Sequence, residues 1–324
     1  MGVYNGAKTI LTPLNSIYKQ PIDESEFEVV IVDDCSTDET TDVVREFQKQ
    51  HSNILLVCRP ENHRLGAVRN VGLSVAKGTY LQFIDADDEI GKDIVAALDN
   101  AIKSDADVQK NGCSVQSQDM VWEYIGVTDK SHTNFCEEIF TTAPDFGGTC
   151  FYLWKREFIK KYNRHFVEDV KMEDTDWVEF YLANAHKITC FDGETYRYFY
   201  TPTSITKGVS ITSLTDMTLQ CYRRLMVIEE YKASLPNFTD NIKQACLYRV
   251  NNMLRYRNLT KFSYSDFPII YKRISKGTRE ALSHYHLSSF AKMVLRHRYL
   301  TLSLLYTTAW VSHVGRFCVH GLRK

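Results

Sequence analysis

Residues 76–90, AKGTYLQFIDADDEI, carry the signals that decide the fold prediction. Thr79–Ile84 is a short run of β-branched, aromatic and apolar residues, which predicts a buried strand. The run is followed by closely spaced carboxylates: Asp85, Asp87, Asp88 and Glu89. Anions at this spacing repel one another unless a cation lies between them, and Mg²⁺ and Mn²⁺ prefer hard oxygen ligands. The stretch therefore predicts a metal site at a strand end, with an acidic helix-capping turn as the alternative.

Two further strands are predicted upstream, over Glu28–Val32 and Ile54–Cys58. Helices are expected between the strands, over residues 8–20, about 36–50 and 65–76. Strands that alternate with helices at this spacing predict an α/β fold with a mostly parallel, doubly wound sheet. Such sheets bind ligands beyond the carboxyl ends of their strands.

Asp33 and Asp34 come directly after the first of these strands. They would therefore lie at the same edge of the sheet as the acidic turn after Ile84. Ser36 or Thr37 is expected to cap the helix that follows. Two acidic turns at one sheet edge favour a ligand site over two unrelated capping turns.

The composition is that of a globular protein of 324 residues, with 44% apolar and 24% charged residues. Nine cysteines occur without a CxxC pair, so neither a zinc site nor a thioredoxin-like motif is indicated. Residues 1–20 lack a continuous apolar core, so no signal peptide is predicted. We therefore expect a reduced, cytoplasmic chain.

The net charge of −1 conceals an asymmetry between the two ends of the chain. Residues 243–324 hold 15 Lys and Arg against two acids, a net of +13, and the rest of the chain carries −14. This change predicts two domains, residues 1–210 and a basic, mainly helical region over 211–324. Helices are expected over residues 219–231, 242–259 and 267–282.

The last segment, Ser289–Lys324, combines basic residues with the apolar and aromatic run Tyr299–Val311. That run is shorter than the ~20 residues that a membrane span needs. It predicts an interfacial helix at an anionic membrane surface, with a buried C-terminal helix as an equal alternative. No motif supports a nucleic-acid partner.

Several nucleotide-binding classes lose their main support in this sequence. GxGxxG and the P-loop pattern are both absent. A phosphatase of the haloacid dehalogenase type would need Thr or Val where this chain has Glu89. A receiver domain would use an acidic pair such as Asp33-Asp34, but its phosphoacceptor Asp and its Lys cannot be placed.

The order of five motifs resembles family 2 glycosyltransferases. The motifs are VYNG (3–6), VIVDDCSTD (30–38), VRNVG (68–72), AKGTYLQFIDADD (76–88) and MED (172–174). The resemblance covers roughly residues 2–206, and the combination is more specific than any single motif. It implies the type A fold, a Rossmann-like doubly wound mixed sheet with a C-terminal helical region here. It also implies an inverting, metal-dependent enzyme.

The resemblance also implies roles for individual residues. The nucleotide site would contain Val3 and Asn5 beside the base, Asp33 and Asp34 as acceptors for base or ribose, Arg69 at the diphosphate and Asp85 at the ribose or metal. Asp87, with Asp85, would hold Mn²⁺ or Mg²⁺. The plain alternatives are a helix-capping acid for Asp34 and a solvated helix residue for Arg69.

A catalytic base is expected from the second half of the chain. A bound cation would stabilise the departing nucleoside diphosphate, while inversion needs a base on the opposite face of the sugar. The resemblance assigns this base to Asp174, with Glu173 as the second candidate; the alternative is a first-turn acid of helix 175–185. The glycine turn and aromatic strand of Asp145–Trp154 suit an acceptor pocket or plain core, and the hydroxyl-rich Thr201–Thr206 could close over the diphosphate.

The sequence departs from the family pattern in three places. The strand that precedes Val3–Gly6 in the family is missing, so the chain is expected to be truncated there. The usual small-residue loop before the third motif reads Asn62–Gly66. Cys35 stands where the family has glycine after the acidic pair.

The sequence thus predicts transfer of a sugar from a nucleotide donor to a glycan or lipid-linked acceptor. The expected donor is a UDP-sugar. The enzyme would serve cell-surface polysaccharide synthesis from the cytoplasm, peripherally at the inner face of the membrane. A catalytically inactive glycan- or nucleotide-binding module of the same fold is one alternative. A metal-dependent nucleotidyltransferase, which would release pyrophosphate from a nucleoside triphosphate, is another.

Overall fold

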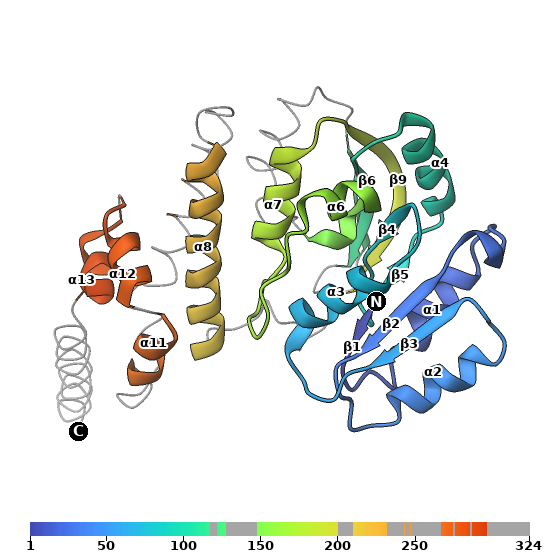
Figure 1. Ribbon diagram of the computed structural model, residues 1–324, viewed down its shortest axis with the longest axis horizontal. Coiled ribbons are helices and arrows are strands. Elements are labelled where there is room, and N and C mark those ends of the chain that lie inside the picture. The colour runs from blue at the N-terminus through green and yellow to red at the C-terminus, as the bar shows by residue number, and fades with distance from the viewer. Residues whose placement is uncertain are drawn as a thin grey trace, which may run out of the picture. The chain divides into compact units, whose positions relative to one another are not determined.

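A computed structural model describes residues 1–116, 122–127, 148–199, 210–231, 243, 247, 267–274, 276–285 and 287–296 (Figure 1). The chain divides into two compact units, Met1–Ser204 and Ile205–Lys324. The expected loop Thr201–Thr206 and the apolar run Tyr299–Val311 lie outside the described residues.

The first unit begins with a parallel sheet in the order β1-β2-β3. Its strands are β1 (Gly2–Val3), β2 (Val29–Asp33) and β3 (Ile54–Cys58). The connecting helices are α1 (Leu11–Tyr18), the short η1 (Glu24–Glu26), α2 (Thr40–Gln48) and α3 (Arg64–Val75). The strands and helices expected from the first 76 residues are therefore present, with ends that move by a few residues.

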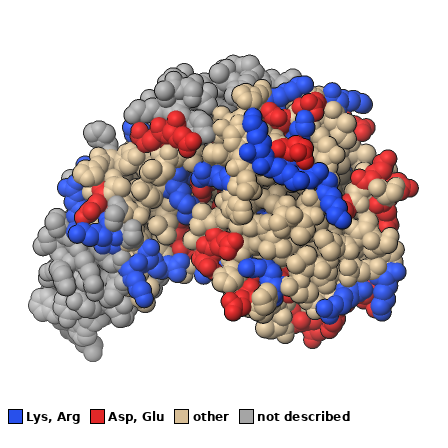
Figure 2. Space-filling model, viewed as in Figure 1, with Lys and Arg blue, Asp and Glu red and all other residues tan. Residues whose placement is uncertain are grey.

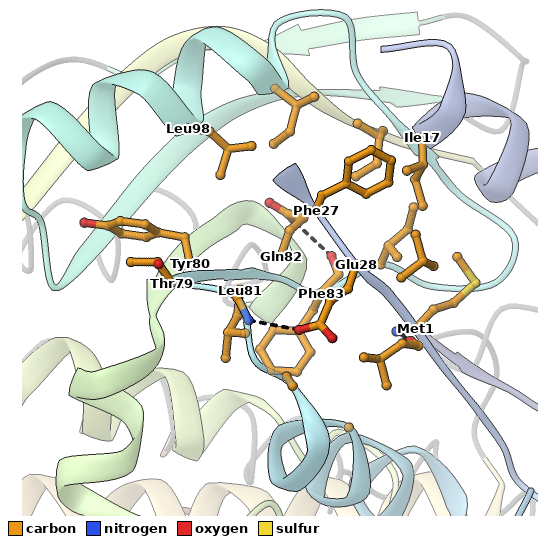
Figure 3. Close-up of a pocket in the computed structure, with 18 of the residues that line it drawn as sticks. Met1, Ile17, Phe27, Glu28, Thr79, Tyr80, Leu81, Gln82, Phe83 and Leu98 are labelled. Carbon is orange, nitrogen blue, oxygen red and sulfur yellow. Dashed lines mark hydrogen bonds between the residues drawn. The ribbon is translucent and has the colours of Figure 1, made fainter. Parts of the chain in front are cut away.

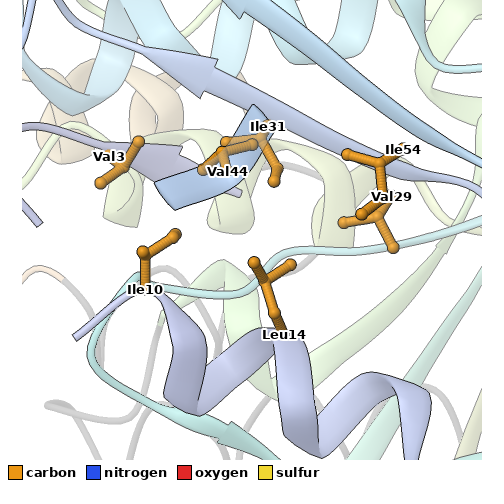
Figure 4. Packing of buried hydrophobic residues seen from close by; sticks show 7 residues of the cluster. All are labelled: Val3, Ile10, Leu14, Val29, Ile31, Val44 and Ile54. Atoms are coloured by element: carbon orange, nitrogen blue, oxygen red, sulfur yellow. The ribbon is translucent and has the colours of Figure 1, made fainter. Parts of the chain in front are cut away.

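The core of this half lies between the sheet and its helices (Figure 4). Ile10 and Leu14 are four residues apart, so both point from the start of α1 toward the strands. Val29 and Ile31 alternate along β2 and meet them, because residues two apart share one face of a strand. Each such buried side chain contributes about 1.5–3 kcal/mol through removal of apolar surface from water. This packing fixes the carboxyl ends of the strands.

The start of α2 differs from the expectation. The helix begins at Thr40, and Ser36 and Thr37 do not cap it. The Asp38 carboxylate accepts from the Thr40 backbone N–H at 3.1 Å instead. Ser36 and Thr37 are used elsewhere, because both hydrogen-bond to Asn5.

The second sheet is mixed. Its strands run in the order β4-β8-β6-β9-β5, with β7 paired to β6. They are β4 (Tyr80–Gln82), β5 (Glu89–Ile90), β6 (Val108–Gln116), β7 (Trp122–Ile125), β8 (Tyr152–Lys155) and β9 (Ile188–Tyr198). Among these pairs β6 and β9 are parallel and the others are antiparallel. The expected mixed sheet is confirmed, whereas mostly parallel pairing holds only for the first three strands.

The two sheets meet at β1. An isolated parallel bridge joins Gly2 to Asp85, while Gly2 also pairs with Val32 of β2. Gly2 and Val3 of β1 therefore pair with the end of β2, and Gly2 also lies beside Asp85. Their position brings the acidic turn after β4 beside the acidic pair after β2.

The helices of the second sheet are α4 (Ile94–Ser104), η2 (Thr149–Phe151), α6 (Arg156–Tyr162) and α7 (Thr175–Asn184). Trp154 of β8 and Trp177 of α7 are fully buried, and Phe166 stacks on Trp177 with ring centroids 4.4 Å apart. The expected aromatic strand is therefore core. Tyr152 and Trp154 are inaccessible to an acceptor, so the acceptor-pocket interpretation of these rings is wrong.

The second unit is helical where it is described. Its helices are α8 (Ile211–Tyr231), α11 (Phe267–Arg273), α12 (Lys276–Ser283) and α13 (Ser289–Arg296). The helix expected over 267–282 is two helices, and the Arg279 guanidinium donates to the carbonyl of Ile274 at the break. Most of the helix expected over 242–259 lies outside the described residues. No helix in the described part of the chain is long and apolar enough to cross a membrane.

Charged side chains of both signs are distributed over the visible face of the first unit (Figure 2). The negative net charge of the first 242 residues therefore does not form one continuous patch on that face. Strong electrostatic fields on this face are therefore expected only at local clusters of charged side chains.

Candidate active site

The first cluster lies at the carboxyl end of β2. Asp33 and Asp34 are 2% and 1% exposed. One Asp33 oxygen accepts from the Ser36 backbone N–H at 3.0 Å. Oδ1 of Asp34 accepts from Arg59 Nη1 at 2.6 Å and from the His63 backbone N–H at 3.2 Å. Both carboxylates are thus held in place by protein donors.

Each of these carboxylates also has an oxygen without a partner. Oδ1 of Asp33 and Oδ2 of Asp34 are buried and accept no hydrogen bond from the part of the chain that the structure describes. An unsatisfied buried acceptor costs about 1–3 kcal/mol. A ligand with N–H or O–H groups would recover that cost, so the pair can act as a hydrogen-bonding site.

Val3 and Asn5 form the adjoining wall. Val3 is buried in the core. Asn5 has a left-handed backbone with φ of 50°, and its side-chain oxygen accepts from the Thr37 backbone N–H at 2.8 Å. Cys35 is also left-handed, with φ of 64°, which explains why the family has glycine there. Asn5 therefore shapes the loop after β2.

The acidic turn after β4 contains three different kinds of carboxylate. Asp88 is buried, and it accepts from the Tyr196 hydroxyl at 2.7 Å and the Phe199 backbone N–H at 2.9 Å. The Asp85 side chain is 33% exposed and accepts from Arg69 Nη2 at 3.2 Å. Asp87 is exposed, and no described residue pairs with its side chain. Of the three, Asp87 is the most accessible to a ligand.

Arg69 of α3 joins this turn to the segment before α7. Its guanidinium forms an ion pair with Glu173 and lies 3.5 Å from Oδ2 of Asp174. Arg69 is 6% exposed and lies over the rings of Phe83 and Phe166. It therefore brings together carboxylates about 90 residues apart in sequence. These carboxylates already make ion pairs with the guanidinium.

The segment before α7 is held against α3 by more than charge. The Asn70 side chain accepts from the Phe166 backbone N–H at 2.8 Å and donates to its carbonyl at 3.0 Å. Gly66 is needed at its position, because a Cβ there would lie 2.1 Å from the Val167 carbonyl oxygen. The unusual Asn62–Gly66 loop thus still packs closely on this segment.

Three carboxylates share one guanidinium, so negative charge is in excess. Burial alone would lower the pKa of Arg69, but Glu173, Asp85 and Asp174 outweigh it and raise that pKa. Burial raises the pKa of Glu173 to about 7 and also raises that of Asp174, although Arg69 opposes both changes. The guanidinium therefore stays charged, and the surplus carboxylates hold protons more readily than free ones.

Glu173 and Asp174 differ in access. The Glu173 side chain is 6% exposed and is paired directly with Arg69. The Asp174 side chain is 19% exposed, and its other contact is the Thr149 backbone N–H at 3.4 Å. Asp174 is thus better placed to meet a substrate hydroxyl.

A family model described as glycosyl transferase family 2 matches residues 1–158. Over these residues, just under half of the chain, the sequence is similar to glycosyl transferase family 2. The matched residues include the first-half candidates from Val3 to Asp87 and four of the five motifs, while MED (172–174) lies outside the match. The resemblance to this family is confirmed.

Curated relatives agree with this family. The chain is 30% identical over 203 residues to poly(ribitol-phosphate) β-N-acetylglucosaminyltransferase TarS of Staphylococcus aureus, covering 60% of this chain and 34% of TarS. It is 41% identical over 93 residues to the putative glycosyltransferase EpsH of Bacillus subtilis, covering 29% of this chain and 26% of EpsH. The chain thus spans about a third or less of the length of these relatives.

Solved structures confirm the type A fold. A crystal structure of S. aureus TarS residues 1–349 with UDP aligns with a TM-score of 0.64 and 20% identity, covering 97% of this chain and 90% of that one. The mannosyltransferase PcManGT of Pyrobaculum calidifontis, in complex with GDP-Man and Mn²⁺, aligns with a TM-score of 0.54 and 18% identity, covering 95% and 84%. At these identities the likeness establishes the fold.

A metal ion at this site would need ligands besides protein side chains. Within the described ranges no group of three His, Cys, Asp or Glu residues has the geometry of a metal site. Mg²⁺ often takes only one or two carboxylates and fills its shell with substrate phosphates and water. The open Asp87 beside the half-exposed Asp85 fits that donor set.

Sequence reasoning missed two residues of the site. Arg59 follows β3 directly, and the register of Asp33 opposite Cys58 places it beside Asp34. That pairing could have been inferred once β2 and β3 were taken as parallel neighbours. Tyr196 is different, because its hydroxyl joins Asp88 to the Asp85 backbone N–H across 108 and 111 residues. No local pattern indicates such a contact.

Proposed function

We propose that this chain is an inverting, metal-dependent glycosyltransferase. It moves a sugar from a UDP-linked donor to a hydroxyl of a glycan or lipid-linked acceptor in cell-surface polysaccharide synthesis. The observation that carries this proposal is the Arg69 cluster, which places the metal-side Asp85 and the candidate base Asp174 within 3.2 and 3.5 Å of one guanidinium. The names of TarS and EpsH, and the UDP bound by TarS, support the donor class.

The donor nucleotide would bind at the carboxyl end of β2. The unpartnered oxygens of Asp33 and Asp34 would accept from base N–H or ribose hydroxyl groups. Val3 and the loop that Asn5 shapes would border the base. Arg69 would act on the diphosphate through its own charge and through Asp85, because two of its N–H groups already donate to Glu173 and Asp85.

Asp87 and Asp85 would hold Mn²⁺ or Mg²⁺. A bound divalent cation stabilises the negative charge that grows on the leaving diphosphate. The structure of PcManGT is a complex with GDP-Man and Mn²⁺, which supports this choice of cation. Asp88 is less suited to the ligand set, since it is buried and each of its oxygens already accepts a hydrogen bond, from Tyr196 or from Phe199.

Asp174 would remove the proton of the acceptor hydroxyl. A general base works best when its pKa lies near the working pH, and burial raises the pKa of Asp174 from its ordinary value. The Thr149 N–H and Arg69 orient the Asp174 carboxylate. The side chain is still 19% exposed, so an acceptor hydroxyl could reach it. Glu173 would then position Arg69.

The deciding experiment is a product assay with the full chain, UDP-sugars and Mn²⁺. A transferase converts UDP-sugar to UDP and a glycosylated acceptor, and slow hydrolysis to UDP and sugar is expected without an acceptor. An inactive binding module would bind UDP without either product. Pyrophosphate released from a nucleoside triphosphate would favour the nucleotidyltransferase and overturn this proposal.

We further propose a cytoplasmic enzyme that binds anionic membranes through residues 243–324, which carry a net of +13. Binding to vesicles that contain phosphatidylserine should weaken steeply between 50 and 500 mM salt, because screening shortens the reach of exposed charges. Vesicles of neutral phosphatidylcholine are the control. Equal binding to both kinds of vesicle would refute an electrostatic attachment.

A further inference from the structure

The Tyr196 side chain of β9 is fully buried against the acidic turn that follows β4. Its hydroxyl donates to Oδ2 of Asp88 at 2.7 Å and accepts from the Asp85 backbone N–H at 3.1 Å. The Phe199 backbone N–H, just beyond β9, donates to Oδ1 of Asp88 at 2.9 Å. These partners are 108 to 111 residues apart in sequence. The end of β9 therefore holds both Asp85 and Asp88.

The strand after the turn is held by β9 as well. Tyr196 and its neighbour Arg197 pair with the two residues of β5. Arg197 Nη1 also lies 2.7 Å from Oε2 of Glu89. Asp87 lies between these fixed points and is the most accessible carboxylate of the turn. The place of Asp87 thus depends on backbone that β9 holds on both sides.

The ring of Tyr196 also packs on the short helix η2. The Phe151 ring meets it edge-on, with the ring centroids 5.7 Å apart. At the other end of η2, the Thr149 backbone N–H donates to Oδ2 of Asp174 at 3.4 Å. This helix thus links the ring that supports the acidic turn to the candidate base.

Gln82, the last residue of β4, joins the strand before the turn to the same helix. It is one of the residues that line a cavity of about 580 Å³ beside β4 (Figure 3). Its side-chain amide donates to the Cys150 carbonyl of η2 at 2.6 Å and to the Phe83 carbonyl at 2.8 Å. Contacts before the turn and within it therefore lead to the same helix.

We propose that Tyr196 is a positioning residue for the cation. Its hydroxyl fixes the backbone around Asp87, and its ring keeps the turn at a constant place relative to η2 and Asp174. Tyr196 is fully buried, so it acts through the turn and not by contact with a substrate. This inference rests on the proposed function, because it takes Asp85 and Asp87 as the residues that hold the cation.

The hydroxyl is the atom that matters, because it serves the turn twice. Without it, Oδ2 of Asp88 and the Asp85 N–H would both lose a buried partner. A buried polar group without a partner is costly, so the turn would move to find other partners or water. A cation would then have to restore the order of the turn when it binds. Loss of hydrogen bonds that orient metal ligands typically costs about 10- to 100-fold in metal affinity.

The test compares Tyr196→Phe with Tyr181→Phe. Tyr181 of α7 is also fully buried, and its hydroxyl likewise makes one donated and one accepted bond. Its partners are the Ile159 carbonyl at 3.1 Å and the Arg164 N–H at 3.0 Å, in α6 and just after it. The two variants lose the same kinds of bond, so their Tm values should fall by similar amounts, about 2–6 °C.

The deciding quantity is the ratio of the Kd for UDP in EDTA to the Kd in Mn²⁺, measured by calorimetry. Tyr196→Phe should lower this ratio by about tenfold through the Kd in Mn²⁺, while Tyr181→Phe should keep it within about twofold. A wild-type ratio in Tyr196→Phe would overturn this inference and leave the proposed function intact. A wild-type protein that binds UDP equally in both buffers would instead refute the metal site.

Amide exchange tests the hold of Tyr196 on the turn without metal or activity. In EDTA, exchange over residues 84–89 should be faster in Tyr196→Phe than in Tyr181→Phe, and equal rates would overturn the inference. The wild type offers a measurement that needs no variant. Mn²⁺ and UDP together should slow exchange over residues 84–89 and at the Phe199 N–H in parallel. Slowing of the turn without Phe199 would also overturn the inference.

Discussion

The carboxylates after β2 and those around Arg69 form two acidic clusters, and their charges are balanced in different ways. Asp33 and Asp34 have their own donors, namely one side chain and two backbone N–H groups. Asp85, Glu173 and Asp174 share one guanidinium. The first cluster is therefore nearly satisfied, and the second has an excess of negative charge.

The difference separates recognition from chemistry. The first cluster can offer two fixed acceptor oxygens, which suits the neutral N–H and O–H groups of a nucleoside. The second cluster can take up a proton or a cation, which suits acid–base work and the binding of a metal diphosphate. Substitutions in the two clusters should therefore fail in different ways.

The largest expected effect is that of Asp174→Asn. Loss of a positioned base typically costs ~10² to 10⁴ in rate, so kcat for sugar transfer should fall by that factor while the Kd for UDP stays within about twofold. Glu168→Gln, an exposed change in the same acidic segment, is the matched control. Wild-type turnover by Asp174→Asn would move the base to Glu173.

Asp87→Asn should weaken UDP binding in Mn²⁺ by about 10- to 100-fold, which corresponds to roughly 1.4–2.8 kcal/mol. The binding in EDTA should hardly change, because the lost interaction passes through the cation. Calorimetry of the wild type and the variant in both buffers measures this difference. Asp99→Asn on α4 removes an exposed carboxylate away from the turn and serves as control. If wild-type affinity is the same in Mn²⁺ and EDTA, the turn holds no metal.

Asp33→Asn should weaken UDP binding about tenfold in Mn²⁺ and in EDTA alike. The amide keeps the size of the side chain but loses the charge that strengthens a hydrogen bond to a nucleoside donor. Glu39→Gln, at the start of α2, changes an exposed acid nearby and should leave binding unchanged. A loss seen only with Mn²⁺ would place Asp33 on the metal side and remove the contrast between the clusters.

Local patterns predicted the elements that carry the first-half residues well. The strand before Asp33, the strand before Asp85 and the helix that carries Arg69 all follow from short apolar runs and their spacing. The family resemblance supplied the candidate roles. Parallel strands place their carboxyl ends together, so the meeting of the two acidic turns needed no further information.

The second cluster was less accessible to sequence reasoning. The pattern around Arg69 is that of an ordinary helix, and nothing local indicates that its guanidinium is buried over the rings of Phe83 and Phe166. Its partners Glu173 and Asp174 arrive from 104 and 105 residues away. Packing between segments distant in the sequence decides which carboxylates contact Arg69, and a local sequence pattern carries no information on that packing. The aromatic strand with Tyr152 and Trp154 could not be assigned for the same reason, since aromatic residues line both protein cores and sugar-binding pockets.

The smallest expected effect concerns Asp88, the carboxylate of the acidic turn that is fully engaged. Burial and the charge of Asp85 raise its pKa to about 8, against an ordinary value near 4. The folded protein therefore binds this proton more tightly than the unfolded chain. The corresponding stability is present at low pH and is lost as the pH rises toward and through 8. Asp88→Asn cannot ionise, yet its amide oxygen can still accept from the Tyr196 hydroxyl or the Phe199 N–H.

In EDTA, the Tm of Asp88→Asn should therefore exceed that of the wild type by a few degrees at pH 9, with a much smaller difference at pH 5. Asp99→Asn should follow the wild type across this range. EDTA matters because a bound cation would offset the charge of the turn and hide the effect. A constant Tm difference between pH 5 and 9 would mean that Asp88 does not titrate in this range. The excess charge would then belong to the Arg69 cluster alone.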